Sequence, residues 1–294
     1  IHLAGLSKLG ANFEIQNGFV VGSVKSQLIG NKIKLPFPSV GATENILMAS
    51  VLAKGETKIS NAAREPEIED LSKCLIKMGA KIEGHGTKTI LVQGVTNLKK
   101  AEHEIIADRI VAGTYIIAAL MLNSTLEINN FNSIYLKSLI DILKKMGAKL
   151  KVSKNSIKVS KGSKLKSTSL STSPYPGFPT DLQAQLMSLM CISDGKSKIK
   201  ETIFENRFMH VPELNRLGAN ITVEKDTATI IGNQTFKGAQ VMASDLRASI
   251  SLVLAAMNAN GQTTLNRVYH LDRGYENIEK TLGSLGVKIK RQKN

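Results

Sequence analysis

A tripeptide of Leu or Met, Gly and a small residue recurs five times at nearly constant spacing, and this repeat restricts the fold more than any other feature. The central glycines are separated by 69, 68, 71 and 68 residues. The five copies are Leu9-Gly10-Ala11, Met78-Gly79-Ala80, Met146-Gly147-Ala148, Leu217-Gly218-Ala219 and Leu285-Gly286-Val287. Solenoid repeats have periods of roughly 20 to 50 residues. Units of this greater length are expected to build globular domains in groups.

The residues around each tripeptide predict a helix followed by a β-hairpin. Upstream of Gly79, apolar residues at Ile68, Leu71 and Leu75 follow the period of an amphipathic helix. The glycine itself is a typical helix end. Downstream of the third copy, apolar residues alternate over 148–152 and again over 157–159, as in two paired strands. We therefore predict that a hairpin closes each unit.

A second helix in each unit is apolar nearly all round, for example over 182–190, and such a helix is buried. Ser, Thr or Asp is expected at its N-cap. The candidates are Thr43, Asp108, Asp181 and Asp245. A short strand such as 57–59 separates the two helices of a unit. The predicted unit is helix, strand, helix, strand, strand, and the chain holds four of them after the tail of a fifth.

The composition suggests an anionic ligand. Lys and Arg number 39 against 24 Asp and Glu, giving a formal charge of +15, which suits phosphate-bearing partners or nucleic acid. Aromatic residues are 4% and Trp is absent, which disfavours domains that stack single-stranded bases. Arg grips carboxylate or phosphate with two parallel hydrogen bonds. Five of the eight arginines fall in short polar motifs: Arg64, Arg109, Arg207, Arg247 and Arg273.

Several classes of protein and site are disfavoured. The longest apolar run, 110–122, is shorter than the roughly 20 residues that cross a bilayer. The N-terminus does not read as a signal peptide, and Cys74 and Cys191 lie in apolar helical patterns, so a reducing cytoplasm is expected. The histidines lack the spacing of metal ligands. Residues 194–197 do not complete a P-loop, and residues 84–86 are not a dinucleotide-binding motif. No metal or organic cofactor is predicted.

Four polar clusters open helices at equivalent positions in the units. Free N–H groups and the helix dipole at such positions can bind anions. Arg247, one turn inside its helix, would add a bidentate grip. The alternative interpretation is that the Thr and Asp residues only cap their helices. The clusters are 39–45, 61–67, 179–181 with 205–207, and 245–247 with 272–275.

These segments resemble the UDP-N-acetylglucosamine 1-carboxyvinyltransferase family of enolpyruvyl transferases. The resemblance covers essentially the whole chain, and NAAREPEI and ENRFMHVPEL are its most specific motifs. It implies an α/β fold of two inverse α/β barrel domains, each with three βαβαββ units, and substrates bound between the domains. It also implies transfer of the enolpyruvyl group of phosphoenolpyruvate to the 3-hydroxyl of UDP-N-acetylglucosamine, with release of phosphate. This is the first committed step of peptidoglycan synthesis.

Two alternatives stay open. The 5-enolpyruvylshikimate-3-phosphate synthases share the fold and differ in the acceptor. A basic nucleic-acid-binding protein is suggested only by the charge. The resemblance favours small-molecule substrates, with no nucleic acid, membrane or cofactor, and leaves the oligomeric state open.

The resemblance also divides the chain near Ile106. Residues 1–106 are expected to be an incomplete first domain, of half a unit and one unit, on the nucleotide-sugar side. Residues 107–294 are expected to be a second domain of three units, on the phosphoenolpyruvate and general-base side. Six units need more residues than the chain has. We therefore expect an N-terminal truncation that omits the family's proton-donating Cys, and a 294-residue chain that is inactive alone.

Roles for individual residues follow from the resemblance. Asp181 matches the carboxylate that takes the proton of the sugar hydroxyl. Phe37 and Pro38 stand where relatives have a basic residue toward the diphosphate, which leaves this chain's part in diphosphate binding open. We expect Asp181, Arg247 and Arg273 to face one cleft. The residues expected to bind substrates are Ser39, Val40, Gly41, Asp181, Ile203, Phe204, Arg207, Arg247 and Arg273.

Overall fold

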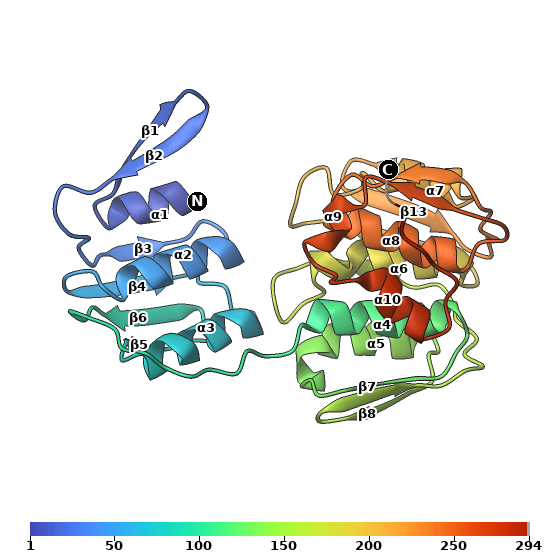
Figure 1. Cartoon of the computed structure of the whole chain (residues 1–294), viewed down its shortest axis with the longest axis horizontal. Helices are drawn as coiled ribbons and strands as arrows, with labels where there is room; N and C mark the ends of the chain where they lie inside the picture. The colour runs from blue at the N-terminus through green and yellow to red at the C-terminus, as the bar shows by residue number, and fades with distance from the viewer. Residues whose placement is uncertain (293–294) are drawn as a thin grey trace. The chain divides into compact units, whose positions relative to one another are not determined.

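A computed structural model describes residues 1–292, which form two compact units (Figure 1). The first unit is Ile1–Ile106, and the second begins at Ala107. No helix in this part of the chain has the length and apolar character needed to span a membrane.

The first unit contains a four-stranded sheet of order β3-β4-β6-β5 and three helices. Strand β3 runs parallel to β4, and the other pairs are antiparallel. Ile46 and Leu47 on α2 are fully buried and belong to the hydrophobic core that α2 forms with this sheet. The elements are α1 (His2–Lys8), β1 (Asn12–Gln16), β2 (Phe19–Ser23), β3 (Lys32–Lys34), α2 (Val40–Ser50), β4 (Glu56–Ser60), α3 (Pro66–Lys77), β5 (Lys81–Glu83) and β6 (Thr89–Gln93).

The hairpin of β1 and β2 forms a separate two-stranded sheet in the first unit. Its apolar side chains face solvent: Ile15 is 81% and Phe19 73% exposed. The predicted pattern of a helix followed by a hairpin is therefore present here, without burial of the hairpin.

The second unit repeats the same arrangement. Its sheet β10-β11-β13-β12 has the order of β3-β4-β6-β5, again with the first pair parallel. The elements from the first helix to the end of that sheet are α4 (Arg109–Met121), β7 (Leu126–Asn129), η1 (Ser133–Leu136), α5 (Lys137–Lys145), β8 (Leu150–Ser153), β9 (Ser156–Val159), β10 (Ser169–Ser171), η2 (Thr180–Leu182), α6 (Gln183–Ile192), β11 (Lys196–Lys200), α7 (Val211–Arg216), β12 (Asn220–Glu224) and β13 (Thr227–Ile231).

The last repeat of the second unit is built differently at its end. Its elements are β14 (Gln240–Met242), α8 (Leu246–Met257), β15 (Thr264–Asn266), α9 (Tyr269–Asp272) and α10 (Ile278–Ser284). After Gly286 no strand forms within the described residues. The prediction that a hairpin closes each unit is therefore wrong for this part of the chain, and correct for the four earlier copies.

The repeated glycines end helices as predicted. All five adopt positive φ, between 93° and 104°. This left-handed conformation carries a steric penalty for residues with a Cβ atom, and glycine avoids it. The tripeptide recurs because each helix must end there and the chain must turn, in the first four copies into a hairpin.

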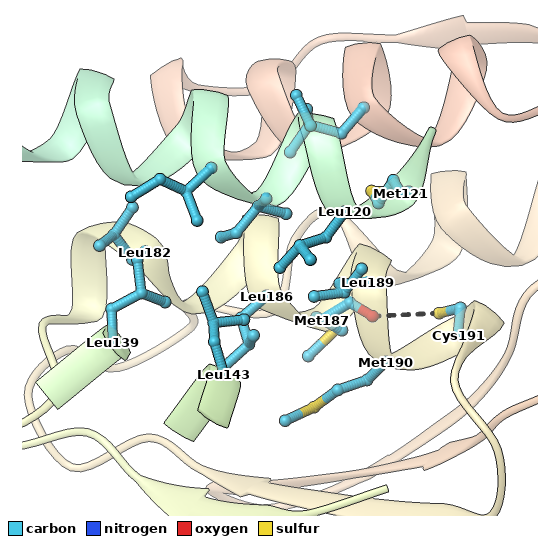
Figure 2. Packing of buried hydrophobic residues seen from close by; sticks show 14 of the residues in the cluster. Leu120, Met121, Leu139, Leu143, Leu182, Leu186, Met187, Leu189, Met190 and Cys191 are labelled. Atoms are coloured by element: carbon cyan, nitrogen blue, oxygen red, sulfur yellow. Dashed lines mark hydrogen bonds between the residues drawn. The ribbon is translucent and has the colours of Figure 1, made fainter. Parts of the chain in front are cut away.

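The core of the second unit is formed around α6 (Figure 2). Leu182 and Leu186 lie against Leu139 and Leu143 of α5, and α4 and α8 also pack on α6. Every residue from Gln183 to Cys191 is buried, which confirms that this helix, apolar nearly all round, is a buried one. Because α4 and α8 both pack against the buried helix α6, the core sets the positions of the residues at their N-terminal ends.

Candidate functional site

Two of the predicted helix caps are confirmed. Asp108 Oδ1 accepts hydrogen bonds from the Ile110 and Val111 amides, at 2.7 and 3.0 Å, and begins α4. Asp245 Oδ1 accepts from the Arg247 and Ala248 amides, at 2.7 and 3.0 Å, and begins α8. These carboxylates satisfy amides that would otherwise lack partners.

Thr43 is not a cap, and that prediction is wrong. It lies inside α2, whose N-cap is Ser39. The Thr43 hydroxyl donates to the Ser39 carbonyl at 2.7 Å and accepts from the Ala63 amide at 3.1 Å. A serine four residues upstream supplies the cap, so Thr43 instead ties α2 to the segment before α3.

Asp181 does not cap a helix either. A 3-10 turn, η2, precedes α6, and the cap position is Pro179. The Asp181 carboxylate is paired with arginines: its Oδ1 accepts a hydrogen bond from Arg207 Nη2 at 2.8 Å and forms an ion pair with Arg247, whose Nε lies 3.1 Å away. The alternative that Asp181 only caps a helix is therefore wrong.

The arginines keep Asp181 ionised. Burial raises the pKa of Asp181, but Arg247, Arg207 and the more distant Arg109 outweigh burial and hold that pKa below its usual value. Burial lowers the pKa of Arg247, and Asp181 more than compensates, so that pKa lies above its usual value. At neutral pH the cluster therefore holds an ionised carboxylate between charged guanidiniums.

The two guanidiniums keep donors for a further anion. An arginine has five N–H donors. Among the described residues, the Arg207 guanidinium makes one hydrogen bond and the Arg247 guanidinium one ion pair, both to the same oxygen of Asp181. Their side chains are only 22% and 18% exposed. Partly desolvated donors of this kind bind phosphate or carboxylate strongly.

Arg207 is positioned by its own segment. Its guanidinium lies 5.2 Å from the centre of the Phe204 ring, within the range of a cation–π interaction. Ile203, Phe204 and Arg207 border a groove of about 960 Å³ in the second unit. The two apolar residues predicted to lie beside a substrate therefore share a groove with an arginine of the cluster.

Glu201 is a site-organising residue that the sequence analysis missed. It is buried, and its Oε1 accepts from the Ile203 and Phe204 amides at 2.8 and 3.2 Å. Its Oε2 accepts from the Thr180 hydroxyl at 2.9 Å. Glu201 thereby joins the segment carrying Arg207 to the turn carrying Asp181. Its only sequence signal is an acidic residue directly after a lysine-rich strand.

Arg109 also belongs to this region. It is buried at the first position of α4, with its guanidinium 5.7 Å from the centre of the Tyr175 ring. It contributes to the lowered pKa of Asp181. The sequence placed Arg109 in a polar motif without assigning it to the site.

Arg273 is exposed at the C-cap of α9. No hydrogen bond or ion pair within residues 1–292 joins it to Asp181. Its neighbour Asp272 pairs with both terminal nitrogens of Arg291, at 2.9 and 2.6 Å. A shared cleft for Arg273, Asp181 and Arg247 stays a prediction.

The other predicted residues lie in the first unit, at the start of α2. The Ser39 hydroxyl accepts weakly from the Ala42 amide at 3.4 Å, and Val40 and Gly41 follow in the first turn. A Cβ atom at Gly41 would lie 3.0 Å from Cε1 of His2. Burial, with Glu67 and Glu65 nearby, raises the pKa of Glu44. This end of the unit is a close-packed turn with backbone amides at a helix N-terminus.

The two cysteines both lie in helices. Cys191 is fully buried in α6, its Sγ 3.3 Å from the Met187 carbonyl (Figure 2), and burial raises its pKa to about 12. Cys74 is half-buried in α3. Among the described residues, no group of three or more His, Cys, Asp or Glu side chains could hold a metal ion.

Comparison with known proteins decides the family. The profile of the EPSP synthase (3-phosphoshikimate 1-carboxyvinyltransferase) family matches residues 1–282. A UDP-N-acetylglucosamine 1-carboxyvinyltransferase from Pelagibacter ubique is 52% identical over 291 residues, covering 99% of this chain and 70% of that protein. UDP-N-acetylglucosamine 1-carboxyvinyltransferase 2 from Mesorhizobium japonicum has the same identity and coverage. The chain belongs to the UDP-N-acetylglucosamine 1-carboxyvinyltransferase family.

Solved structures support the fold of an enolpyruvyl transferase. The enolpyruvyl transferase NikO from Streptomyces tendae matches 98% of this chain and 71% of its own, with a TM-score of 0.90 and 26% identity. EPSP synthase from Acinetobacter baumannii matches 99% of this chain and 71% of its own, with a TM-score of 0.76 and 18% identity. This similarity shows the fold alone. The predicted inverse α/β barrel class is confirmed, and the EPSP synthases are its distant relatives.

Proposed function

We propose that this chain provides binding and base groups for transfer of an enolpyruvyl group from phosphoenolpyruvate to the 3-hydroxyl of UDP-N-acetylglucosamine. The observation that carries the proposal is the Asp181 carboxylate held between Arg207 and Arg247 at the start of a buried helix. The family relationship supplies the substrates. The reaction would serve peptidoglycan synthesis in the cytoplasm, and through it cell-wall biogenesis, cell shape and division.

In the proposed reaction Asp181 is the general base. It removes the proton of the sugar 3-hydroxyl as that oxygen forms a bond to C2 of phosphoenolpyruvate, while C3 gains the proton that the family's Cys would donate. Loss of a proton from C3 then restores the double bond as the bond from C2 to the phosphate oxygen breaks. The products are the enolpyruvyl ether and inorganic phosphate, and no metal or cofactor takes part.

The shared arginines connect substrate binding to the strength of the base. While both guanidiniums hold Asp181, its carboxylate is a weak proton acceptor. The phosphate and carboxylate of phosphoenolpyruvate would bind the remaining N–H donors of the same two guanidiniums and share their positive charge. Their arrival weakens the hold on Asp181 and makes it more basic when the hydroxyl is to be deprotonated. Arg273 is the third arginine that we assign to the anion.

The first unit is proposed as the nucleotide-sugar side and the second as the phosphoenolpyruvate side. Backbone amides of Ser39, Val40 and Gly41 would contact the nucleotide, as the N-terminus of α2 favours negative charge. Ile203 and Phe204 would contact the sugar. Phe37 and Pro38 carry no charge for the diphosphate.

Calorimetric titration of the chain tests this proposal. We expect binding of UDP-N-acetylglucosamine and none of shikimate 3-phosphate at the same concentrations. Preference for shikimate 3-phosphate would favour the related synthase activity. Binding of duplex DNA that weakens steeply with salt, without binding of either sugar or shikimate ligand, would favour a nucleic-acid-binding protein. Phosphate release with both substrates present tests the expectation that the 294-residue chain alone does not catalyse the transfer.

A further inference from the structure

Three buried polar side chains form a hydrogen-bonded chain next to the Asp181 and Arg247 pair. Thr114 of α4 and Tyr275 after α9 are each 3% exposed, and Gln185 of α6 is fully buried. The Thr114 and Tyr275 hydroxyl oxygens are 2.8 Å apart, and Gln185 Nε2 lies 3.3 Å from Thr114 Oγ1. This chain joins the three repeats of the second unit.

The directions of these hydrogen bonds follow from counting hydrogens. A Thr hydroxyl has one hydrogen and accepts through two lone pairs. The Thr114 hydrogen goes to the Ile110 carbonyl, at 2.9 Å. Thr114 must therefore accept from both Gln185 and Tyr275. The Tyr275 hydroxyl donates to Thr114, which leaves its oxygen as an acceptor.

Both ends of the chain reach the proposed site. The second Nε2 hydrogen of Gln185 goes to the Asp181 carbonyl, at 2.8 Å. At the other end the Tyr275 hydroxyl is close enough to Arg247 to add to the raised pKa of that guanidinium, after the larger effects of burial and Asp181. One buried chain therefore anchors the backbone of the base and faces the arginine paired with it.

Tyr275 also fixes the turn that carries Arg273. Gly274 separates Arg273 from Tyr275, and a Cβ atom there would lie 2.7 Å from Cδ2 of Leu246. This close approach sets the turn against the residue directly before Arg247. With Tyr275 bonded to Thr114, the turn is held on two sides.

We propose that Tyr275, through the hydrogen bond from its hydroxyl to Thr114, is a positioning residue that sets Arg247 and the Arg273 turn for binding the anionic groups of phosphoenolpyruvate. The inference rests on the proposed function. Tyr275 acts through the positions of Arg247 and of the Arg273 turn, so its loss changes affinity for the anion through geometry.

The test is calorimetric binding of phosphoenolpyruvate to the whole chain with Tyr275→Phe. We expect affinity to fall about 5- to 100-fold, the range for losing one buried hydrogen bond next to a charged group. Tyr269→Phe is the matched control: Tyr269 is 58% exposed and its hydroxyl bonds Arg267 on the surface. The control should bind as the parent chain does.

A second pair of variants separates positioning from general stability. Thr114→Val should weaken binding as Tyr275→Phe does, Thr114→Ser should restore it, and the double variant of Tyr275→Phe with Thr114→Val should be no weaker than either alone. If Tyr275→Phe does not fold, the two Thr114 variants give the same comparison.

The outcomes are distinguishable. A lower melting temperature with unchanged phosphoenolpyruvate affinity would make Tyr275 merely structural and overturn the inference. Effects of Tyr275→Phe and Thr114→Val that simply add would overturn the proposed contact. A parent chain that binds neither phosphoenolpyruvate nor UDP-N-acetylglucosamine would overturn the proposed function, and with it this inference.

Discussion

In an enzyme completed with the N-terminal segment that carries the family's Cys, replacing Asp181 with Asn is expected to slow enolpyruvyl transfer by about 100- to 10,000-fold, because a general base contributes a factor of this size. Asn keeps the volume and polarity of the side chain and cannot take the proton. Folding should survive, since Asp181 caps no helix and its side chain is 38% exposed. Substrate-dependent phosphate release measures the loss, and Asp194→Asn, an exposed Asp bonded to Asn233, is the control.

The pH dependence has a definite sign. The arginines hold the pKa of Asp181 below its usual value, so the carboxylate stays ionised until the pH falls through that lowered pKa. The acid limb of kcat/KM should therefore lie below about pH 4, the usual range of an Asp. Asp181→Asn should keep phosphoenolpyruvate binding, because it frees N–H donors of two arginines. Loss of binding together with turnover would show that Asp181 organises the anion site and is not the base.

Arg247→Lys is expected to weaken phosphoenolpyruvate binding about 10- to 150-fold, the equivalent of one charge-assisted hydrogen bond. Lys keeps the charge and loses the planar fork that matches phosphate or carboxylate. The pKa of Asp181 should rise as well, because Arg247 is the strongest of the arginines that lower it.

Titration calorimetry measures this affinity. Arg216→Lys is the control, because Arg216 is 61% exposed and lies beside Glu213. This variant should bind phosphoenolpyruvate as the parent chain does. Unchanged affinity of Arg247→Lys would mean that the guanidinium grips no anion.

The repeated architecture could be predicted from the sequence because its signals are local. Glycine recurs at these positions because it adopts the required left-handed backbone conformation without strain. The burial of α6 is indicated by a helix that is apolar on nearly all sides. The helix N-caps were harder to predict from the sequence. Asp108 and Asp245 were correctly predicted to be N-caps. Thr43 was not, because Ser39, one turn earlier, is the N-cap of that helix.

The site itself depends on contacts that no local pattern encodes. Whether Asp181 caps a helix or pairs with arginines is decided by a 3-10 turn and by Arg207, 26 residues away. Thr114 meets Gln185 and Tyr275 across 71 and 161 residues of sequence. Glu201 acts through amides of its own loop and the Thr180 hydroxyl, which become its partners only in the folded chain.

The most direct test of the account is a crystal structure of the chain grown with UDP-N-acetylglucosamine and phosphoenolpyruvate. We predict phosphate or carboxylate oxygens of phosphoenolpyruvate within about 2.7 to 3.2 Å of the Arg247 and Arg207 nitrogens, and the sugar 3-hydroxyl within the same distance of the Asp181 carboxylate. Both arginines still paired with Asp181, and the ligands bound elsewhere, would contradict the assignment of this cluster as the reaction site.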